Sequence, residues 1–393
     1  MRRLVSLSMP VLTGLTLLVT GCGKPKVIKI ASQCPLSGPQ ESGGTPVMQG
    51  AQLAAELLAG PLEKMGFKVE FVAFDDKADP ETGVSNAKKI VEDPSILAII
   101  GHYNSGVELA ASEFYHTANL CNVSPSNTHP KVTDRGYLEV NRVCGRDDVQ
   151  GSMGAQFLKK KDLKTVYVLH DTTPYGQGIA SVFKKEAEAL GIRVVGLMGT
   201  KEKTDFSALV TTVNATKPEA IYFGGTYDTA AFFKQVREKG FKGTFVSDDG
   251  LDSPETAKLA GDALVTGGGT YFSTVAGPAF AYADTNQFIS DFKVKYNASP
   301  QPYAAQAYDA TALALKAIEN AAKAADGKIP ARIDVCKAIR AIKAFPGSTG
   351  AITFNNKGDL ELARYFIIQV TTADPARWGT NRIDLSLPIP PPN

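Results

Sequence analysis

The 393-residue chain has almost no excess of charge of either sign, because 42 Lys and Arg residues face 40 Asp and Glu residues. Without a basic surplus it has little to hold a phosphate backbone, so we do not expect it to bind nucleic acid. Its 44% hydrophobic and 21% charged residues are typical of a soluble globular protein and exclude collagen-like, disordered and polytopic membrane proteins. The length exceeds one ordinary hydrophobic core, so we expect two lobes.

Familiar catalytic motifs are missing. No G-x-G-x-x-G follows the first predicted strand, and Walker, G-x-S-x-G and H-E-x-x-H motifs do not occur. Two of the four histidines, His102 and His170, follow predicted strands, where a general base could stand. Because neither has a nucleophile or a metal partner at a recognisable spacing, we predict structural roles for both. The chain is therefore predicted not to be an enzyme.

The first 21 residues are predicted to be an export signal. Arg2 and Arg3 precede an apolar run over residues 11–19, which is too short to span a bilayer but suits a secretory signal. The small residues before Cys22 resemble the cleavage site of bacterial lipoproteins, in which the cysteine is lipidated. We therefore expect an exported, periplasmic lipoprotein anchored to the membrane through Cys22. A plain secretory signal with an incidental cysteine is the alternative.

Export would place the four remaining cysteines, Cys34, Cys121, Cys144 and Cys336, in an oxidising compartment. They could form disulfides in three pairings, among which the sequence does not choose. None belongs to a C-x-x-C motif or to a Cys/His cluster with the spacing of metal ligands. We therefore predict no metal site and no cofactor.

Short apolar runs alternate twice with longer amphipathic stretches, which predicts parallel sheets with helices on both faces. The first set has strands near 27–32, 69–74, 96–101 and 121–124 and helices near 44–58, 81–92 and 105–118. The second has strands near 165–170, 193–198, 220–223 and 244–247 and helices near 175–190, 205–214, 229–239 and 254–259. Helices near 286–296, 304–325 and 333–344 precede two last strands, near 351–354 and 365–371.

The loops after these strands carry polar residues, and ligands of such folds bind beyond the carboxyl ends of the strands. In the first set, Asn104 and Ser105 open a helix and Ser126 follows the next strand, so hydroxyl and N–H groups could receive a carboxylate. In the second set, Asp248 and Asp249 follow a strand, and one of these two carboxylates could hold an ammonium group. A zwitterion needs this combination, although each loop alone could equally be a helix-capping turn.

Motifs spread in order from about Val27 to Val370 resemble those of the branched-chain amino acid binding proteins, which are type I periplasmic binding proteins of ABC transporters. The motifs are Pro35-Leu36-Ser37-Gly38-Pro39, Asp75-Asp76 with Asp79-Pro80, Gly101-His102, Ser124-Pro125-Ser126, Asp134-Arg135-Gly136-Tyr137, Arg142 with Gly145 to Gly151, Tyr175-Gly176-Gln177-Gly178, Asp205-Phe206-Ser207, Tyr222-Phe223-Gly224-Gly225 and Gly350 to Gly358. The resemblance implies an α/β fold of two doubly wound parallel-sheet lobes joined by a three-strand hinge.

The resemblance also implies where the lobes begin and end. The first lobe would comprise residues 27–145 and 273–346, and the second residues 146–272 and 347–375. The chain would cross between them near Gly145, Phe272 and Gly347. Residues 376–393 are expected to be a Pro-rich, extended surface tail, with a groove-binding polyproline segment as the alternative.

Carried over position by position, the resemblance implies that Ser105 and Thr128 bind the α-carboxylate of a ligand and that Asp249, where the family uses Glu, holds its ammonium group. Tyr175 would close over the ligand, and Tyr303 would form an aromatic wall. The other expected ligand-binding residues are Asn104, Ser126, Asn127, Thr226 and Tyr227. The loop of residues 39–44 lacks the aromatic residue expected near Gly43, so we expect a larger or more polar pocket for the ligand side chain.

The sequence thus predicts a monomeric substrate-binding lipoprotein that captures an amino acid, branched-chain or related, and delivers it to the permease of an ABC importer. Ligand contacts from both lobes would stabilise the closed form, which a permease can distinguish from the open one. Alternatives are the same fold binding an amide or urea, the same fold acting as a ligand sensor, and an amidase using His102 or His170.

Overall fold

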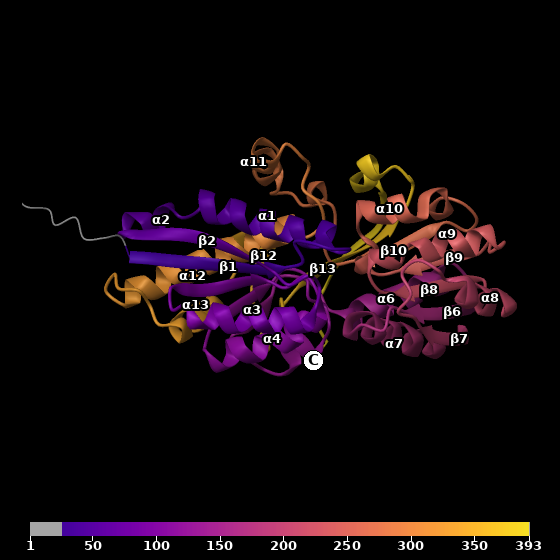
Figure 1. Cartoon of the computed structure of the whole chain (residues 1–393), viewed down its shortest axis with the longest axis horizontal. Coiled ribbons are helices and arrows are strands. Elements are labelled where there is room, and N and C mark those ends of the chain that lie inside the picture. Colours follow the sequence, from indigo (N-terminus) through magenta and orange to yellow (C-terminus); the bar gives the residue numbers. More distant parts are fainter. Residues whose placement is uncertain (1–25, 393) are drawn as a thin grey trace, which may run out of the picture.

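The computed structural model describes residues 26–392 and contains two large sheets side by side, each covered by helices (Figure 1). We call the five-stranded sheet with its helices the first lobe and the seven-stranded sheet with its helices the second lobe. The predicted fold class, two α/β lobes built on parallel strands, is confirmed. The predicted signal sequence over residues 1–21 and the cysteine at position 22 lie outside the described residues.

The first sheet is wholly parallel and has the order β2-β1-β3-β4-β5. Its strands are β1 (Lys26–Cys34), β2 (Phe67–Asp75), β3 (Ile96–Gly101), β4 (Cys121–Ser124) and β5 (Val140–Arg142). One face packs against α1 (Glu41–Leu57), α2 (Gly60–Lys64), α12 (Ala304–Ala324) and α13 (Arg332–Ala341). The other packs against α3 (Pro80–Glu92) and α4 (Ser105–Thr117), and the short α5 (Lys131–Asp134) follows β4. Successive strand residues point to opposite faces, so Ile99 packs under α3 and α4 while Ile100 faces α1 and α12.

The second sheet has the order β14-β13-β10-β9-β8-β6-β7, in which β13 and β14 run antiparallel to their neighbours. The strands are β6 (Thr165–His170), β7 (Arg193–Gly199), β8 (Ala220–Gly224), β9 (Thr244–Ser247), β10 (Thr270–Thr274), β13 (Ala363–Gln369) and β14 (Arg382–Ile389). Helices α6 (Asp147–Lys160) and α7 (Pro174–Ala189) cover one face, where the ring of Phe183 stacks on Tyr222 at 3.7 Å between centroids. Helices α8 (Ser207–Ala215), α9 (Ala231–Glu238) and α10 (Pro254–Ala260) cover the other.

Three segments link the lobes. The chain passes from β5 to α6 of the second lobe, from β10 to α11 (Asn286–Tyr296) and α12 of the first, and from the hairpin β11 (Phe345–Gly347) and β12 (Gly350–Ile352) to β13. At the first crossing, the buried Asp359 accepts from Arg142 Nε at 2.6 Å and from Arg146 Nη1 at 2.9 Å. The third link follows the hairpin that contains Gly347, and β14 extends the second sheet beyond residue 375. We otherwise retain the predicted crossings and lobe boundaries as a proposal.

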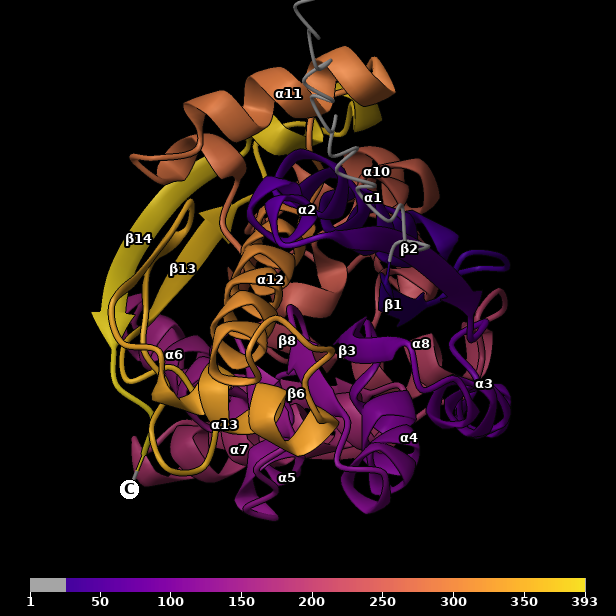
Figure 2. The same ribbon diagram turned by 90° about the vertical axis from the view of Figure 1, so that its left-hand side faces the viewer.

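The C-terminal residues differ from the expected free surface tail. Residues 382–389 form β14, which pairs along its length with β13 at the outer edge of the second sheet (Figure 2). The prolines at positions 388 and 390–392 suggested a polyproline conformation. Pairing with β13 instead gives residues 382–389 the conformation of a β-strand. An edge strand tolerates Pro388 because only one of its sides needs hydrogen-bond donors.

The described cysteines, Cys34, Cys121, Cys144 and Cys336, are buried free thiols. Burial raises the pKa of the Cys121 thiol well above its ordinary value, and the neighbouring thiol of Cys336 raises it further. Cys121 on β4 and Cys336 on α13 are therefore side by side inside the first lobe.

Within residues 26–392, no helix combines the length and the apolar character that crossing a membrane requires.

Candidate functional site

A cavity of about 110 Å³ lies between the two lobes, beyond the carboxyl ends of their strands. Its wall includes many residues of the predicted site: Asn104, Ser105, Ser126, Tyr175, Thr226, Asp249 and Tyr303. Residues that were not predicted to bind the ligand also line it, namely Gln40, Ala78, Pro80, Tyr103, Gly106, Val107, Thr173, Pro174 and Gly250. Most of the lining residues come directly after strands. The cavity therefore lies where ligands of parallel-sheet folds bind, beyond the carboxyl ends of the strands.

The first-lobe wall is built from neutral polar groups. Ser105 is the first residue of α4, where backbone N–H groups have no partner within the helix. Its hydroxyl accepts from the backbone N–H of His129 at 3.4 Å. Ser126 follows β4 and donates its hydroxyl to the carbonyl of His102 at 2.9 Å, which holds the two strand-end loops together. This wall offers hydroxyl and N–H donors without a charged side chain of its own.

Three residues of the predicted site do not line the cavity. Asn127 is fully buried and joins the two loops, accepting from His102 N at 3.0 Å and donating to Tyr103 O at 3.0 Å. The Tyr227 hydroxyl accepts from the backbone N–H of Gly43 at 3.0 Å, so it connects the lobes. Thr128 lies behind the wall, and its backbone carbonyl accepts from the N–H of Asp147 at 3.0 Å.

Asp249 is the carboxylate of the second-lobe wall. Its Oδ1 accepts from Gln150 Nε2 at 2.5 Å and from the Tyr175 hydroxyl at 2.6 Å. Its Oδ2 accepts from the hydroxyl of Tyr303, which immediately precedes α12 of the first lobe. Burial raises the pKa of the Asp249 carboxyl, while these hydrogen bonds oppose the shift. The site thus holds a buried carboxylate that a ligand cation would stabilise.

Two more aspartates, Asp147 at the start of α6 and Asp248 after β9, are fully buried next to Asp249. Burial, reinforced by the charge of Asp249, raises the pKa of both carboxyls well above the ordinary value. Neither oxygen of Asp147 has a hydrogen-bond partner within residues 26–392, nor does Asp248 Oδ1. In the part of the chain that the structure describes, no group of three or more His, Cys, Asp or Glu side chains could hold a metal ion. The second-lobe wall is therefore acidic, and none of the three carboxylates forms an ion pair within residues 26–392.

Comparison with known proteins fits this architecture. The family model for periplasmic binding proteins matches residues 27–375. The chain belongs to that family. It is 33% identical over 336 residues to the Leu/Ile/Val-binding protein homolog 1 of Brucella abortus, covering 84% of this chain and 87% of the relative. It is 32% identical over 339 residues to the leucine-, isoleucine-, valine-, threonine- and alanine-binding protein of Pseudomonas aeruginosa, covering 85% of this chain and 87% of the relative.

A solved periplasmic binding protein also shares the fold. The crystal structure of the leucine-binding protein LivK of Thermotoga maritima superposes with a TM-score of 0.80 at 29% identity, covering 92% of this chain and 98% of that structure. The resemblance to the branched-chain amino acid binding proteins, and the type I fold that it implied, are confirmed. These relatives are named as binding proteins and not as enzymes.

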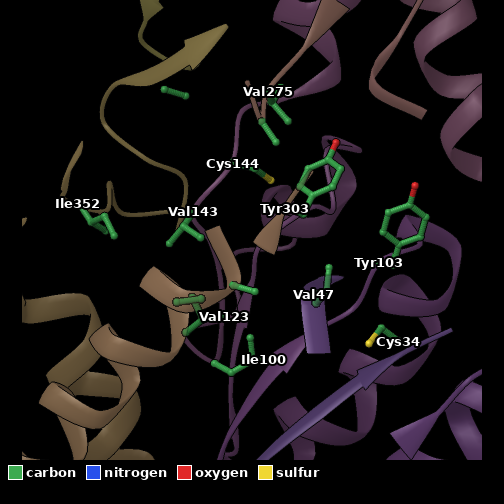
Figure 3. Close-up of a cluster of buried hydrophobic side chains, with 14 of the residues drawn as sticks. Cys34, Val47, Ile100, Tyr103, Val123, Val143, Cys144, Val275, Tyr303 and Ile352 are labelled. Atoms are coloured by element: carbon green, nitrogen blue, oxygen red, sulfur yellow. The ribbon is translucent and has the colours of Figure 1, made fainter. Parts of the chain in front are cut away.

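In this periplasmic binding protein, Tyr103 occupies the space left by the missing aromatic residue near Gly43. A Cβ atom placed on Gly43 would lie 2.4 Å from Cζ of Tyr103. The rings of Tyr103 and Tyr303 meet edge to face, 6.0 Å apart, at the border of the first-lobe core. Both hydroxyl groups point the same way, away from Ile100 and Val123 (Figure 3). The expected gap is therefore filled by a ring from a different loop, which sequence position alone did not indicate.

The two histidines considered as general bases do not line the cavity. His102 is buried inside the first lobe, with Nδ1 3.3 Å from Asp76 Oδ2 and Nε2 3.2 Å from the Tyr115 hydroxyl. His170 ends β6 and accepts from the backbone N–H of Thr172 at 3.2 Å. Both side chains have partners within their own lobes, in keeping with structural roles.

Proposed function

We propose that this protein binds an amino acid between its lobes as the substrate-binding component of an ABC importer. The observation that carries the proposal is the asymmetry of the cavity wall. Neutral hydroxyl and N–H donors from the first lobe face a buried carboxylate from the second. A zwitterion satisfies both sides at once, because its carboxylate accepts hydrogen bonds and its ammonium group donates them.

The α-carboxylate of the ligand would lie at the start of α4, where the Ser105 hydroxyl, free N–H groups of the first turn and the partial positive charge of the helix all favour an anion. Its ammonium group would pair with Asp249, which Tyr175 and Tyr303 hold in place. Binding needs no covalent chemistry, so the proposal includes no enzymatic step.

The names of the relatives support an amino acid as the ligand. One is called a Leu/Ile/Val-binding protein homolog and another a leucine-, isoleucine-, valine-, threonine- and alanine-binding protein. We further propose that the N-terminal residues are a signal peptide and that Cys22 carries a lipid anchor, which would hold a monomeric protein beside the membrane permease that receives the ligand.

Isothermal titration of ligand-stripped protein against the twenty amino acids, urea and short amides tests the proposal. At least one amino acid is expected to bind more tightly than ~100 μM, which corresponds to about −5.5 kcal/mol. If no amino acid reaches this affinity, the assignment is wrong. Mass spectrometry of the protein made in a lipidating host tests the anchor, with Cys22→Ala as the control that loses it.

A further inference from the structure

A chain of hydrogen bonds crosses from one lobe to the other along the wall formed by Gln40, Asn104 and Thr226. Asn104 Nδ2 donates to Gln40 Oε1 at 2.7 Å. Gln40 Nε2 in turn donates to Thr226 Oγ1 at 3.2 Å and to Asp228 Oδ2 at 3.4 Å. We call these four residues the relay. If the ligand carboxylate lies at Ser105 and its ammonium group at Asp249, the relay lines a part of the cavity that remains for the ligand side chain.

Asp228, together with Asp171, sets the direction of the bonds in the relay, although neither aspartate is part of the cavity wall. An ionised carboxylate only accepts hydrogen bonds. The Thr226 hydroxyl donates its proton to Asp228 Oδ1 at 2.7 Å, with Asp171 Oδ2 at 3.4 Å as a second acceptor, so toward Gln40 it too can only accept. Gln40 must therefore direct its amide N–H groups toward the second lobe and its Oε1 toward Asn104. Because Oε1 is an acceptor, Asn104 must donate to it through Nδ2.

Because Asn104 uses its Nδ2 in the relay, its other side-chain atom, Oδ1, receives no hydrogen bond from the relay. That oxygen is buried and has no hydrogen-bond partner among residues 26–392. Asn104 precedes the first turn of α4, but its side chain does not cap the helix. A buried acceptor without a donor is costly, and the amide cannot simply turn over, because Asp228 fixes its orientation through Gln40.

We propose that the bound amino acid carries a hydrogen-bond donor on a short side chain, either a hydroxyl or a carboxamide, and that Asn104 Oδ1 receives it. The inference rests on the proposed function and narrows its ligand class. The carbon atoms of such a side chain would contact the apolar wall residues Val107 and Pro174, and the cavity of about 110 Å³ limits its length. An aliphatic side chain of the same shape would leave Oδ1 unpaired and is rejected for that reason.

Two isosteric ligand pairs test the ligand class by isothermal titration of the ligand-stripped mature protein. Threonine differs from valine, and asparagine from leucine, mainly in the polarity of groups of similar shape. We expect at least one polar member to bind tenfold or more tightly than its aliphatic partner. Valine and leucine binding as tightly as threonine and asparagine, or more tightly, would overturn the inference. If none of the four binds and no other amino acid does, the proposed function itself fails.

Asp228→Asn tests the relay without altering the cavity wall. An asparagine at position 228 can donate, so Gln40 and then Asn104 are free to turn over. The polar-to-aliphatic affinity ratio of the preferred pair is expected to fall below about threefold. Ser42→Ala is the matched control, because it removes the cross-lobe bond between Ser42 and Ser253 (2.9 Å) outside the relay. A general effect on lobe closure would change the affinities for both ligands of a pair by the same factor. The ratio of the two affinities would then stay the same. A ratio unchanged in Asp228→Asn would overturn the role given to Asp228.

Discussion

The two lobes have the same kind of fold but different electrostatic character where they face each other. The first lobe presents Ser105 and Ser126, whose groups are neutral. The second presents Asp249, with Asp147 and Asp248 buried behind it. Neither wall alone provides for both ends of a zwitterion. A ligand that touches both walls would compensate the negative charge of the second lobe while the first lobe binds its carboxylate. Both contacts exist only when the lobes are closed, so we expect ligand recognition to depend on closure.

Removing the charge of Asp249 is the most direct test of this difference between the two walls. Asp249→Asn is expected to weaken binding of the preferred amino acid by about 2–5 kcal/mol, roughly 30- to 5,000-fold, because the ligand ammonium group loses its partner. Isothermal titration gives the affinity, and circular dichroism checks that the fold is intact. An unchanged affinity would mean that the carboxylate which holds the ammonium group is a different one, and Asp248→Asn would then be examined next.

Weakening the neutral wall is expected to have a smaller effect. Ser105→Ala removes one hydroxyl donor to the ligand carboxylate and should cost ~1.5–3 kcal/mol in affinity, since hydrogen bonds to charged groups have that magnitude. Ser207→Ala is the matched control, because Ser207 is the first residue of α8 and lies on the surface, outside the cavity wall. Equal losses in the two variants would show that α4 does not bind the carboxylate.

The pH dependence of the stability of the ligand-free protein gives a further test of the acidic wall. Burial raises the pKa of Asp147, so its folded form favours the protonated acid. The contribution of Asp147 to the free energy of unfolding is therefore greatest below pH ~4 and is lost as the pH rises through its raised pKa. Asp147→Asn should raise the melting temperature relative to wild type more at pH 8 than at pH 5.

Asp148→Asn provides the control for that melting experiment. Asp148 is next in sequence, but its carboxylate is paired with Arg146 at 2.7 Å and is partly exposed. This variant should not gain stability at high pH. If Asp147→Asn and Asp148→Asn behave alike, the acidic wall is not the source of the pH dependence.

The smallest expected effect is optical and concerns Asp252, which neighbours the acidic wall. Burial raises the pKa of this carboxyl to about 7, and its Oδ1 accepts from the indole N–H of Trp378 at 2.8 Å. Trp378 is the single tryptophan of the chain. Its fluorescence should therefore change with a midpoint near pH 7, and the change should disappear in Asp252→Asn. A titration that persists in this variant would assign the signal to another group.

The repeated pattern of strands and helices was predictable from the sequence because each element has a strong local signal. Strands β3, β4, β6 and β9 and helix α11 have the predicted bounds. The three-residue strand β5 and the proline-containing β14 were missed, since their conformation depends on pairing with distant strands. Loop positions at strand ends also located most of the cavity wall.

The details of the site depend on closure and were not predictable in the same way. Tyr103 fills the space beside Gly43 from a loop sixty residues further along the chain. The bond between Gln40 and Thr226 joins residues 186 positions apart and exists only because the lobes meet. No local pattern encodes such contacts, whereas a Ser or Asp directly after an apolar strand is visible in the sequence.

Strand β14 has a consequence for the solubility of the protein. One side of β13 pairs with β10, and without β14 its other side would present unpaired N–H and C=O groups, a template for pairing with another chain. Pro388 and the charged Arg382 and Asp384 on β14 make the new outer edge a poor template in turn. While β14 is unpaired, the outer side of β13 is an open, aggregation-prone edge. Deleting residues 382–392 should therefore reduce soluble yield even though they lie outside the binding cavity.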